Sequence, residues 1–244
     1  MIIDFHTHMF PDKIAARTID FLSKTGGDMN PFTDGTWKRL KESTKQAGID
    51  HSIVLPIATR PGQFHTINEF ATHFQEGTLI SFGSLHPESE NYKEELKQIQ
   101  DMGMKGIKLH PDYQDTYFND IRYKRIISYA TELGLIISVH AGQDPKCPDN
   151  IHCTPAMAEE VLNEVEPEKL VLAHMGGNEL WSEVEERLVG WKYSTFPNFI
   201  STRLRIKGFL TVCRKNSFFV WYANTVQTGL CLELILRGQI RKSL

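Results

Sequence analysis

Histidine residues stand where three short apolar segments end, and this placement constrains the fold and the site more than any other feature of the chain. The segments read Asp4-Phe5-His6-Thr7-His8, Ser138-Val139-His140-Ala141-Gly142 and Ala173-His174-Met175-Gly176-Gly177. Because alternate side chains of a β-strand share a face, His6 and His8 can point the same way, about 6 to 7 Å apart along the strand. That spacing allows both imidazoles to bind one metal ion.

Apolar runs alternate with helical patterns along about the first 190 residues, as is typical of βα units around a parallel sheet. Most of the runs are continuous, as expected of strands covered on both faces. The predicted strands are Met1–Phe5, Ser52–Ile57, Leu79–Ser84, Gly106–Leu109, Leu135–Val139 and Leu170–Ala173. The predicted helices are Lys13–Ser23, Trp37–Ala47, Thr66–Gln75, Glu88–Met102, Asn119–Glu132, Pro155–Glu164 and Glu179–Leu188.

Six such units in about 190 residues extrapolate to eight in about 250, which is the size of a (β/α)₈ barrel of the TIM type. An open doubly wound sheet is the alternative. The barrel is favoured because its strand ends converge on one mouth, whereas an open sheet concentrates its site at a single switch point. Polar residues follow many different predicted strands, namely His6 and His8, Arg60, His86, Lys108 and His110, His140, and His174.

Composition predicts one domain over residues 1–244 and a small-molecule substrate. With 244 residues, of which 41% are hydrophobic, the chain can bury one sizeable core. Lysine and arginine number 27 against 30 acidic residues, and without a basic run nothing favours a nucleic acid or a membrane as partner. We find no signal-peptide pattern or apolar span, so a cytoplasmic location is expected, with the four cysteines as free thiols.

Four motifs together resemble the amidohydrolase superfamily, specifically the amidohydrolase-related branch that includes aminocarboxymuconate-semialdehyde decarboxylase. They are Asp-x-His-x-His at residues 4–8, Gly-Ile-Lys-Leu-His-Pro at 106–111, Val-His-Ala-Gly at 139–142 and Ala-His-Met-Gly-Gly at 173–177. The motifs occur in the family's order, and the resemblance covers residues 1 to 190. A TIM barrel and metal-dependent chemistry are what it implies.

The resemblance also implies roles for single residues. His6, His8 and His140 would bind a divalent metal, usually zinc, and His174 would be a catalytic acid/base or water-orienting group, or a ligand of a second metal. The chemistry is consistent, because neutral imidazoles suit zinc and a neighbouring histidine can move a proton. Asp4 shares the strand face of His6 and His8 and would support a ligand or belong to the buried strand network. A homodimer is a further expectation from relatives.

Several polar residues are open to more than one interpretation. Lys108 would be a carboxylated, metal-bridging lysine in a binuclear site, but a cation that anchors substrate or a structural ion pair is favoured, and we do not assign it to metal. Arg60 and His86 would either meet an anionic substrate or lie on surface loops. No comparable context surrounds the other histidines, which we interpret as ordinary polar positions: His51, His65, His73 and His152.

The segment 191–244 departs from the family pattern. Relatives carry an aspartate at the end of the eighth strand, yet after Glu186 the only acidic residue of this chain is Glu233. A shifted reading frame in the coding sequence is one hypothesis, under which Gly208–Phe218 returns to frame as a helix. We therefore expect the seventh and eighth units to be incomplete or distorted, with reduced activity as a consequence.

The predicted function is that of a metal-dependent hydrolase that uses metal-activated water on a small amide, ester or carboxylate-bearing substrate. Nonoxidative decarboxylation on the same metal site is the close alternative. A third hypothesis, from another class, is an inactive metal-binding remnant of such an enzyme.

Overall fold

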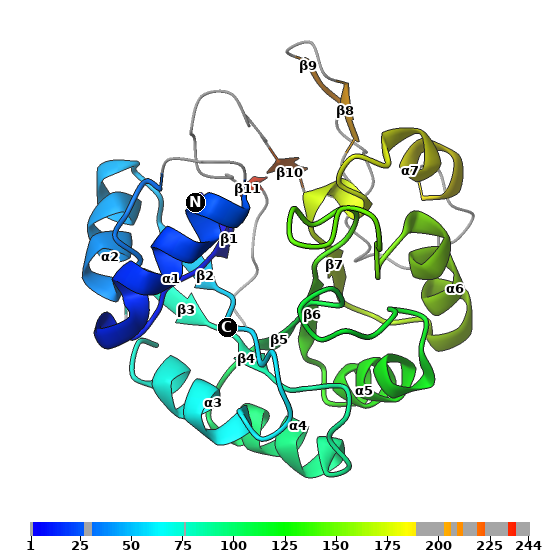
Figure 1. Cartoon of the computed structure of the whole chain (residues 1–244), viewed down its shortest axis with the longest axis horizontal. Helices are drawn as coiled ribbons and strands as arrows, with labels where there is room; N and C mark the ends of the chain where they lie inside the picture. Colours follow the sequence, from blue (N-terminus) through cyan, green and yellow to red (C-terminus); the bar gives the residue numbers. More distant parts are fainter. Residues whose placement is uncertain are drawn as a thin grey trace.

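The computed structural model describes residues 2–26, 31–75 and 77–188, and beyond them the backbone of four short strands (Figure 1). These four are β8 (Arg203–Arg205), β9 (Phe209–Thr211), β10 (Phe219–Tyr222) and β11 (Leu234–Arg237). The remaining residues of the segment 191–244 lie outside the described part, and so does most of the hypothesis about its reading frame.

Parallel strands form the centre of the molecule. They are β1 (Ile3–Thr7), β2 (His51–Val54), β3 (Leu79–Ser81), β4 (Gly83–Ser84), β5 (Gly106–Leu109), β6 (Ile136–Val139) and β7 (Leu170–Leu172). One sheet contains β1, β2 and β3 in that order, and a second contains β4, β5, β6 and β7. All six predicted strands are thus present, although the third is divided at Phe82, whose amide N–H donates to the carbonyl of Val54 at 2.9 Å.

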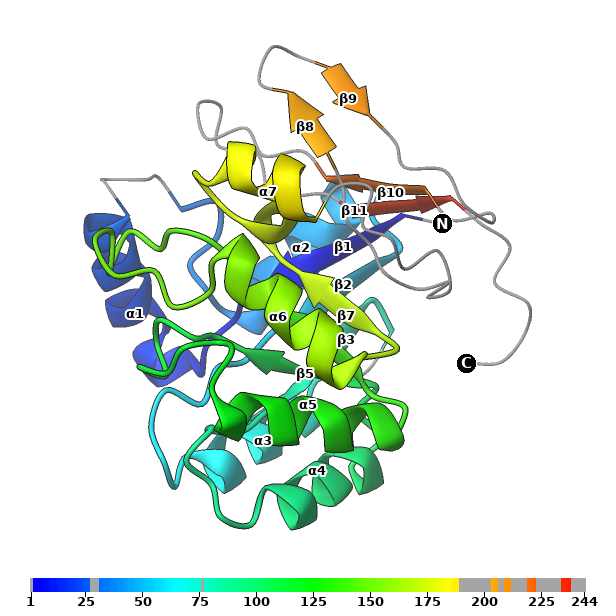
Figure 2. The same cartoon turned by 90° about the vertical axis from the view of Figure 1, so that its right-hand side faces the viewer.

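Seven α-helices lie outside the strands within the described part of the chain (Figures 1 and 2). They are α1 (Asp12–Thr25), α2 (Trp37–Gln46), α3 (Phe64–Thr72), α4 (Tyr92–Asp101), α5 (Ile121–Glu132), α6 (Pro155–Val165) and α7 (Trp181–Arg187). Each overlaps a predicted helix. Local sequence explains several ends: the hydroxyl of Thr154 caps α6 before Pro155, and the carboxylate of Asp120 caps α5.

Strands inside and helices outside, joined by parallel βα connections, make this a TIM-barrel fold, as predicted. The bounds of the first strand differ from the predicted Met1–Phe5, because β1 runs from Ile3 to Thr7 and so includes His6. His8 follows directly after the strand. Both histidines nevertheless lie at the carboxyl end of this strand, as the sequence suggested.

The barrel departs from regular geometry where the eighth strand would pair with the first. There β1 pairs with the antiparallel strand β11, with Ile3 opposite Leu234, and β11 pairs in turn with β10. The helix predicted over 208–218 is wrong for Phe209–Thr211, which form β9 and pair antiparallel with β8. Aromatic and β-branched residues favour strands, which accounts for the difference.

The hydrophobic core is concentrated around the strands β5, β6 and β7. Its largest cluster includes Ile107, Ile126, Ile137 and Val161, each without exposed surface. Separate smaller clusters lie under β1, β2 and β3, around Val54 and around Ile53. Among the described residues no helix is long and apolar enough to cross a membrane. Cys147 and Cys153 are free thiols, as predicted, and the other two cysteines lie outside the described side chains.

Candidate active site

His6 and His8 begin the site at the carboxyl end of β1. Their ring centroids lie 5.1 Å apart. The Nδ1 atom of His8 is 2.8 Å from the carbonyl oxygen of Leu55. Because a carbonyl only accepts, this Nδ1 carries the proton, and the Nε2 lone pair of His8 is available to a metal ion.

His174 and His140 extend the same group from the other sheet. The ring of His174 lies 5.0 Å from that of His6 and 4.7 Å from that of His140, between centroids. Its Nε2 atom is 3.1 Å from Nδ1 of His140. The four histidines predicted from sequence therefore form a continuous series of ring contacts, which we call the imidazole group: His8, His6, His174 and His140.

The backbone around His174 has an uncommon conformation. His174 and Met175 have φ angles of 51° and 59°, and Gly176 follows at 89°. Residues other than glycine rarely adopt positive φ, and such strain is frequent at functional sites. This strained turn brings the imidazole of His174 next to that of His6 at the end of β1.

A glycine allows the loop after β6 to pass close to the same turn. Gly142 has a φ of 89°, and a Cβ atom placed there would lie 1.9 Å from the backbone nitrogen of Asn178. A side chain is therefore excluded, and the Val-His-Ala-Gly motif requires its glycine for this close approach.

Lys108 and His110 come from β5 and its carboxyl end. Lys108 is completely buried, and its Nζ atom has no hydrogen-bond partner among the described residues. The ring of His110 stacks on His140 at 4.1 Å and on Tyr113 at 4.0 Å. The structural ion pair considered for Lys108 is not present in the described part of the chain.

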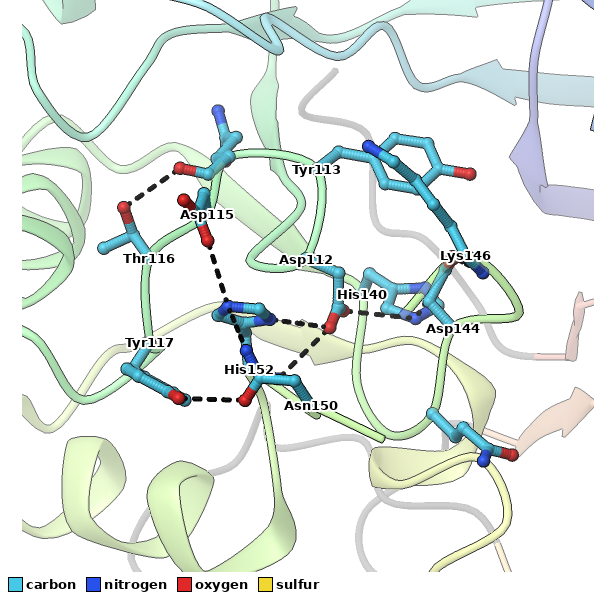
Figure 3. Close-up of polar contacts among 12 residues, drawn as sticks. Asp112, Tyr113, Asp115, Thr116, Tyr117, His140, Asp144, Lys146, Asn150 and His152 are labelled. Carbon is cyan, nitrogen blue, oxygen red and sulfur yellow. Dashed lines mark hydrogen bonds and ion pairs between the residues drawn. The ribbon is translucent and has the colours of Figure 1, made fainter. Parts of the chain in front are cut away.

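Two buried aspartates lie on the other side of His140 (Figure 3). The Nε2 atom of His140 is 3.8 Å from Oδ2 of Asp112 and 3.8 Å from Oδ2 of Asp144. His110 Nε2 is 3.7 Å from the same oxygen of Asp144.

His152 holds Asp112 in place. One oxygen of Asp112, Oδ1, accepts the backbone N–H of His152 at 3.1 Å and lies 3.0 Å from Nδ1 of its ring. Tyr117 stacks on that ring and donates its hydroxyl to Asn150, which also contacts His152 (Figure 3). His152 is buried, so its interpretation as an ordinary polar position is wrong.

The electrostatics keep the imidazoles neutral. Desolvation by burial lowers the pKa of His6, His110 and His140 well below 6.5, and nearby positive groups lower it further. Desolvation and Lys108 also lower the pKa of His174, to about 3. Burial lowers the pKa of Lys108 itself to about 7. Neutral imidazoles are the form in which histidine binds a metal.

The side chain of His8 is exposed to solvent, in contrast to His140. Desolvation among the surrounding protein groups still lowers the pKa of His8, with Lys108 as a second cause. If His8 and the buried histidines bound a metal ion, the exposure of His8 would leave a path by which water or substrate could reach the open coordination position.

The other sequence candidates do not join the site. Arg60 is exposed, as the surface interpretation predicted, whereas His86 is buried and contradicts it. Asp4 is buried, and its Oδ1 accepts the backbone N–H of His6 at 3.2 Å, which supports β1 as predicted. Sequence reasoning missed Asp112 and Asp144. The available signal was their position two and four residues after His110 and His140.

The residues present fit a divalent cation. His110, His140 and Asp144 each offer one ligand atom, and these atoms lie within 4.8 Å of one another. The Nε2 atom of His140 and the Oδ2 atom of Asp112 are buried without a hydrogen-bond partner in the described part of the chain. Nitrogen and carboxylate donors of this kind suit zinc or manganese.

Comparison with known families gives one match that covers most of the chain. The sequence profile of the amidohydrolase family matches residues 3–193. This confirms the resemblance predicted from the four motifs. No curated protein matches the chain in sequence.

Solved structures of low sequence identity share the fold. A 2,6-dihydroxybenzoate decarboxylase bound to 2,6-dihydroxybenzoate has a TM-score of 0.55 and 14% identity, over 82% of this chain and 76% of that one. A manganese-containing 5-carboxyvanillate decarboxylase from Novosphingobium aromaticivorans has a TM-score of 0.55 and 13% identity, over 76% and 66%. A probable 2-pyrone-4,6-dicarboxylic acid hydrolase from Acinetobacter baumannii has a TM-score of 0.46 and 14% identity, over 72% and 58%. The chain thus spans less than two thirds of the length of the last two proteins.

Proposed function

Because this chain belongs to the amidohydrolase family, whose members are metal-dependent hydrolases and decarboxylases, we propose that it is a metal-dependent hydrolase of a small, carboxylate-bearing amide or ester. The observation that carries the proposal is the imidazole group. Its residues come from the ends of β1, β6 and β7, and the rings of His6 and His174 meet although 168 positions separate them in the sequence.

His6, His8 and His140 would hold the cation, for which we propose zinc. When bound, the cation acts as a Lewis acid and lowers the pKa of a coordinated water towards 7. The chain contributes the tautomer of His8, fixed by the carbonyl of Leu55, which leaves Nε2 free to coordinate. It also contributes the ring of His174, which stays neutral because its pKa is lowered to about 3 and which can orient water beside the ligands.

Lys108 is the residue through which we assign the substrate class. Its ammonium group lies among the histidines, buried and without a hydrogen-bond partner in the described region. A carboxylate on the substrate would satisfy this group and compensate its charge. Because Lys108 has no exposed surface, the side chains that cover it would have to move before a substrate carboxylate could contact its Nζ atom.

Nonoxidative decarboxylation is the second candidate. One feature of the sequence favours it: the carboxylate that accepts a proton from attacking water in relatives has no counterpart after Glu186 except Glu233. Breaking a carbon–carbon bond needs no attacking water and hence places less demand on such a base. The decarboxylases among the similar folds make this chemistry the natural comparison.

The decisive experiment combines cation content with product analysis on the full chain. Purified protein loaded with zinc or manganese is assayed on small amides, esters and aromatic acids that carry a carboxylate. Release of amine or alcohol supports hydrolysis, whereas release of CO₂ supports the second candidate. His8→Gln should abolish turnover and the binding of the cation assigned to His6, His8 and His140, and the exposed His65→Gln serves as the control.

A folded, cation-loaded protein without turnover on either set would overturn both chemistries and favour the inactive remnant.

We further propose a cytoplasmic enzyme that acts on a small molecule and forms a homodimer, without nucleic-acid or membrane partners. Light scattering of the purified protein tests the dimer directly.

A further inference from the structure

The two ring nitrogens of His140 face two different groups of side chains. Nδ1 is 3.1 Å from Nε2 of His174 and so belongs to the imidazole group. Nε2 points the other way, towards the oxygens of Asp112 and Asp144 (Figure 3). The proposed cation of the imidazole group does not account for this second set of donors.

The distances in the second set are those of ligands around an ion. The Nε2 atoms of His110 and His140 lie 3.7 Å and 3.8 Å from Oδ2 of Asp144. Hydrogen bonds between such atoms measure about 2.7 to 3.2 Å, so these contacts are too long. Two ligand atoms that each lie about 2.1 Å from a tetrahedral zinc ion are about 3.4 Å apart. The distances from Asp144 to the two histidines are close to this value, and a tilt of the two stacked rings would bring all three ligand atoms around one cation.

Each aspartate is held so that one oxygen stays directed at His140. The backbone N–H of Lys146 donates to Oδ1 of Asp144 at 2.8 Å. His152 occupies Oδ1 of Asp112 through its backbone and its ring. The remaining oxygen of Asp112 is buried and has no hydrogen-bond partner among the described residues. Such outer contacts are typical of the residues that orient metal ligands.

The positive charge near the carboxylates does not compensate them: burial raises the pKa of Asp144 overall, and the charge of Lys146, which lowers it, is the smaller effect. In the ranges that the structure describes, neither Asp112 nor Asp144 forms an ion pair with a lysine or arginine. The ammonium group of Lys146 lies over the ring of Tyr113, 4.8 Å from its centroid. Two buried carboxylates beside two imidazoles leave room for a divalent cation as their counter-charge.

We propose that His110, His140 and Asp144 bind a second divalent cation, with Asp112 as an additional carboxylate contact. This inference rests on the proposed function, since it adds a cation beside the one assigned to His6 and His8. His140 would contribute Nδ1 to the first cation and Nε2 to the second, and because both ring nitrogens would then face a cation, the ring N–H proton of His140 would be released to solvent on binding. The second cation also has the carboxylate ligands that the first one lacks.

Two local changes accompany binding. The backbone N–H of Tyr113 lies 3.4 Å from Nδ1 of His110, at the long limit of a hydrogen bond. Coordination through Nε2 leaves the proton on Nδ1, so this weak contact is given up. The rings of His110 and His140 are stacked 4.1 Å apart and 7° from parallel, and since each Nε2 lone pair lies in its ring plane, the two rings also tilt towards each other when they bind one cation.

The experiment counts cations in the full chain. Chelator-treated protein is equilibrated with Zn²⁺, and bound metal per chain is measured by mass spectrometry and by calorimetric titration. We expect two cations in the unsubstituted protein and one in Asp144→Asn, with affinity at the second site reduced about 100-fold or more. Asp115→Asn is the matched control, because Asp115 is 96% exposed and also contacts His152.

The outcomes separate this inference from the proposed function. If His8→Gln keeps both cations while Asp144→Asn loses one, the first site is wrong and the second stands. If Asp144→Asn keeps two cations of unchanged affinity, the second site is overturned and the first is unaffected. Should Asp144→Asn fail to fold, Co²⁺ titration of the unsubstituted chain decides: two successive sets of absorption bands support the inference, and saturation at one equivalent refutes it.

Discussion

The two halves of the barrel are built on the same βα pattern but differ in how they are packed and in what they bring to the site. Around β5, β6 and β7 a single large cluster is almost free of solvent exposure, whereas β1, β2 and β3 rest on small separate clusters. The first half ends against an antiparallel strand, β11, instead of a parallel eighth strand. The half whose neighbouring βα units are complete therefore has the larger and better buried core.

The two halves of the barrel also supply different side chains to the site. The half around β1 supplies His6 and His8, and His8 is exposed. The half around β5 to β7 supplies the buried residues His140, Asp112 and Asp144. Under the proposed function, the well-packed half would hold its ligands in place, and the exposed His8 would leave access for a substrate.

Truncation of one isoleucine in each half should have the largest effect. Ile126 is completely buried in the large cluster, and Ile53 is 5% exposed in a small one. Changing a buried isoleucine to alanine costs about 2 to 5 kcal/mol, depending on how far the cavity can collapse. We expect Ile126→Ala near the upper end and Ile53→Ala near the lower, as measured by urea unfolding. Equal losses would remove the contrast in packing.

Acid should destabilise the metal-free protein through the buried histidines of the β5–β7 half. Their folded pKa values lie below the unfolded value of 6.5, so the unfolded state binds more protons below that pH. Stability is therefore fully present above pH 6.5 and is lost as the pH falls towards the folded pKa values. The slope should reach at most about 1.4 kcal/mol per pH unit for each histidine.

Urea unfolding of chelator-treated protein between pH 8 and pH 5 measures this slope. His110→Phe keeps the ring stacking and should reduce the slope by the contribution of one proton. The exposed His65→Gln should leave it unchanged. A stability that does not change between pH 6.5 and pH 5 would contradict the prediction.

Replacing Lys108 should stabilise the chain while weakening its site. The buried ammonium has no hydrogen-bond partner in the described part, and such a group costs about 1 to 3 kcal/mol. Lys108→Met should raise the free energy of unfolding by a similar amount and abolish binding of carboxylate-bearing compounds. The exposed Lys146→Met is the control and should leave stability nearly unchanged. A destabilised Lys108→Met would show that a partner of Lys108 has been missed.

The smallest effects are expected for ion pairs on the helices. Lys124 of α5 is 13% exposed and contacts both Glu160 and Glu164 of α6. Lys24 of α1 forms an exposed pair with Asp20. We expect Lys124→Met to cost about 1 kcal/mol and Lys24→Met less than about 0.5 kcal/mol. Thermal unfolding of the two variants at low and high salt measures both, and the reverse order would be inconsistent with the contrast.

Much of the fold could be predicted because its signals are local. Apolar runs and helical spacings indicated the six parallel strands and seven helices, and the glycines at positions 103 and 134 mark helix ends with φ angles of 80° and 70°. The division of the third strand at Phe82 and the bounds of β1 could not be predicted, because both depend on hydrogen bonds to the neighbouring strand.

The site shows the same division. Histidines at strand ends were sufficient to predict that His6, His8, His140 and His174 meet. The contact between Asp112 and His152 was missed because 40 positions separate the two residues and a folded loop brings them together. No spacing rule relates two residues at that distance in the sequence.

The amino-acid sequence alone determined which elements form and which imidazoles lie at their ends, since periodicity and residue type act within a few positions of each other. Only the tertiary structure decided that His140 faces two groups, that Asp112 and Asp144 join it, and that Lys108 is buried without a partner in the described region. These features depend on the burial and orientation of side chains, which arise when distant segments pack together.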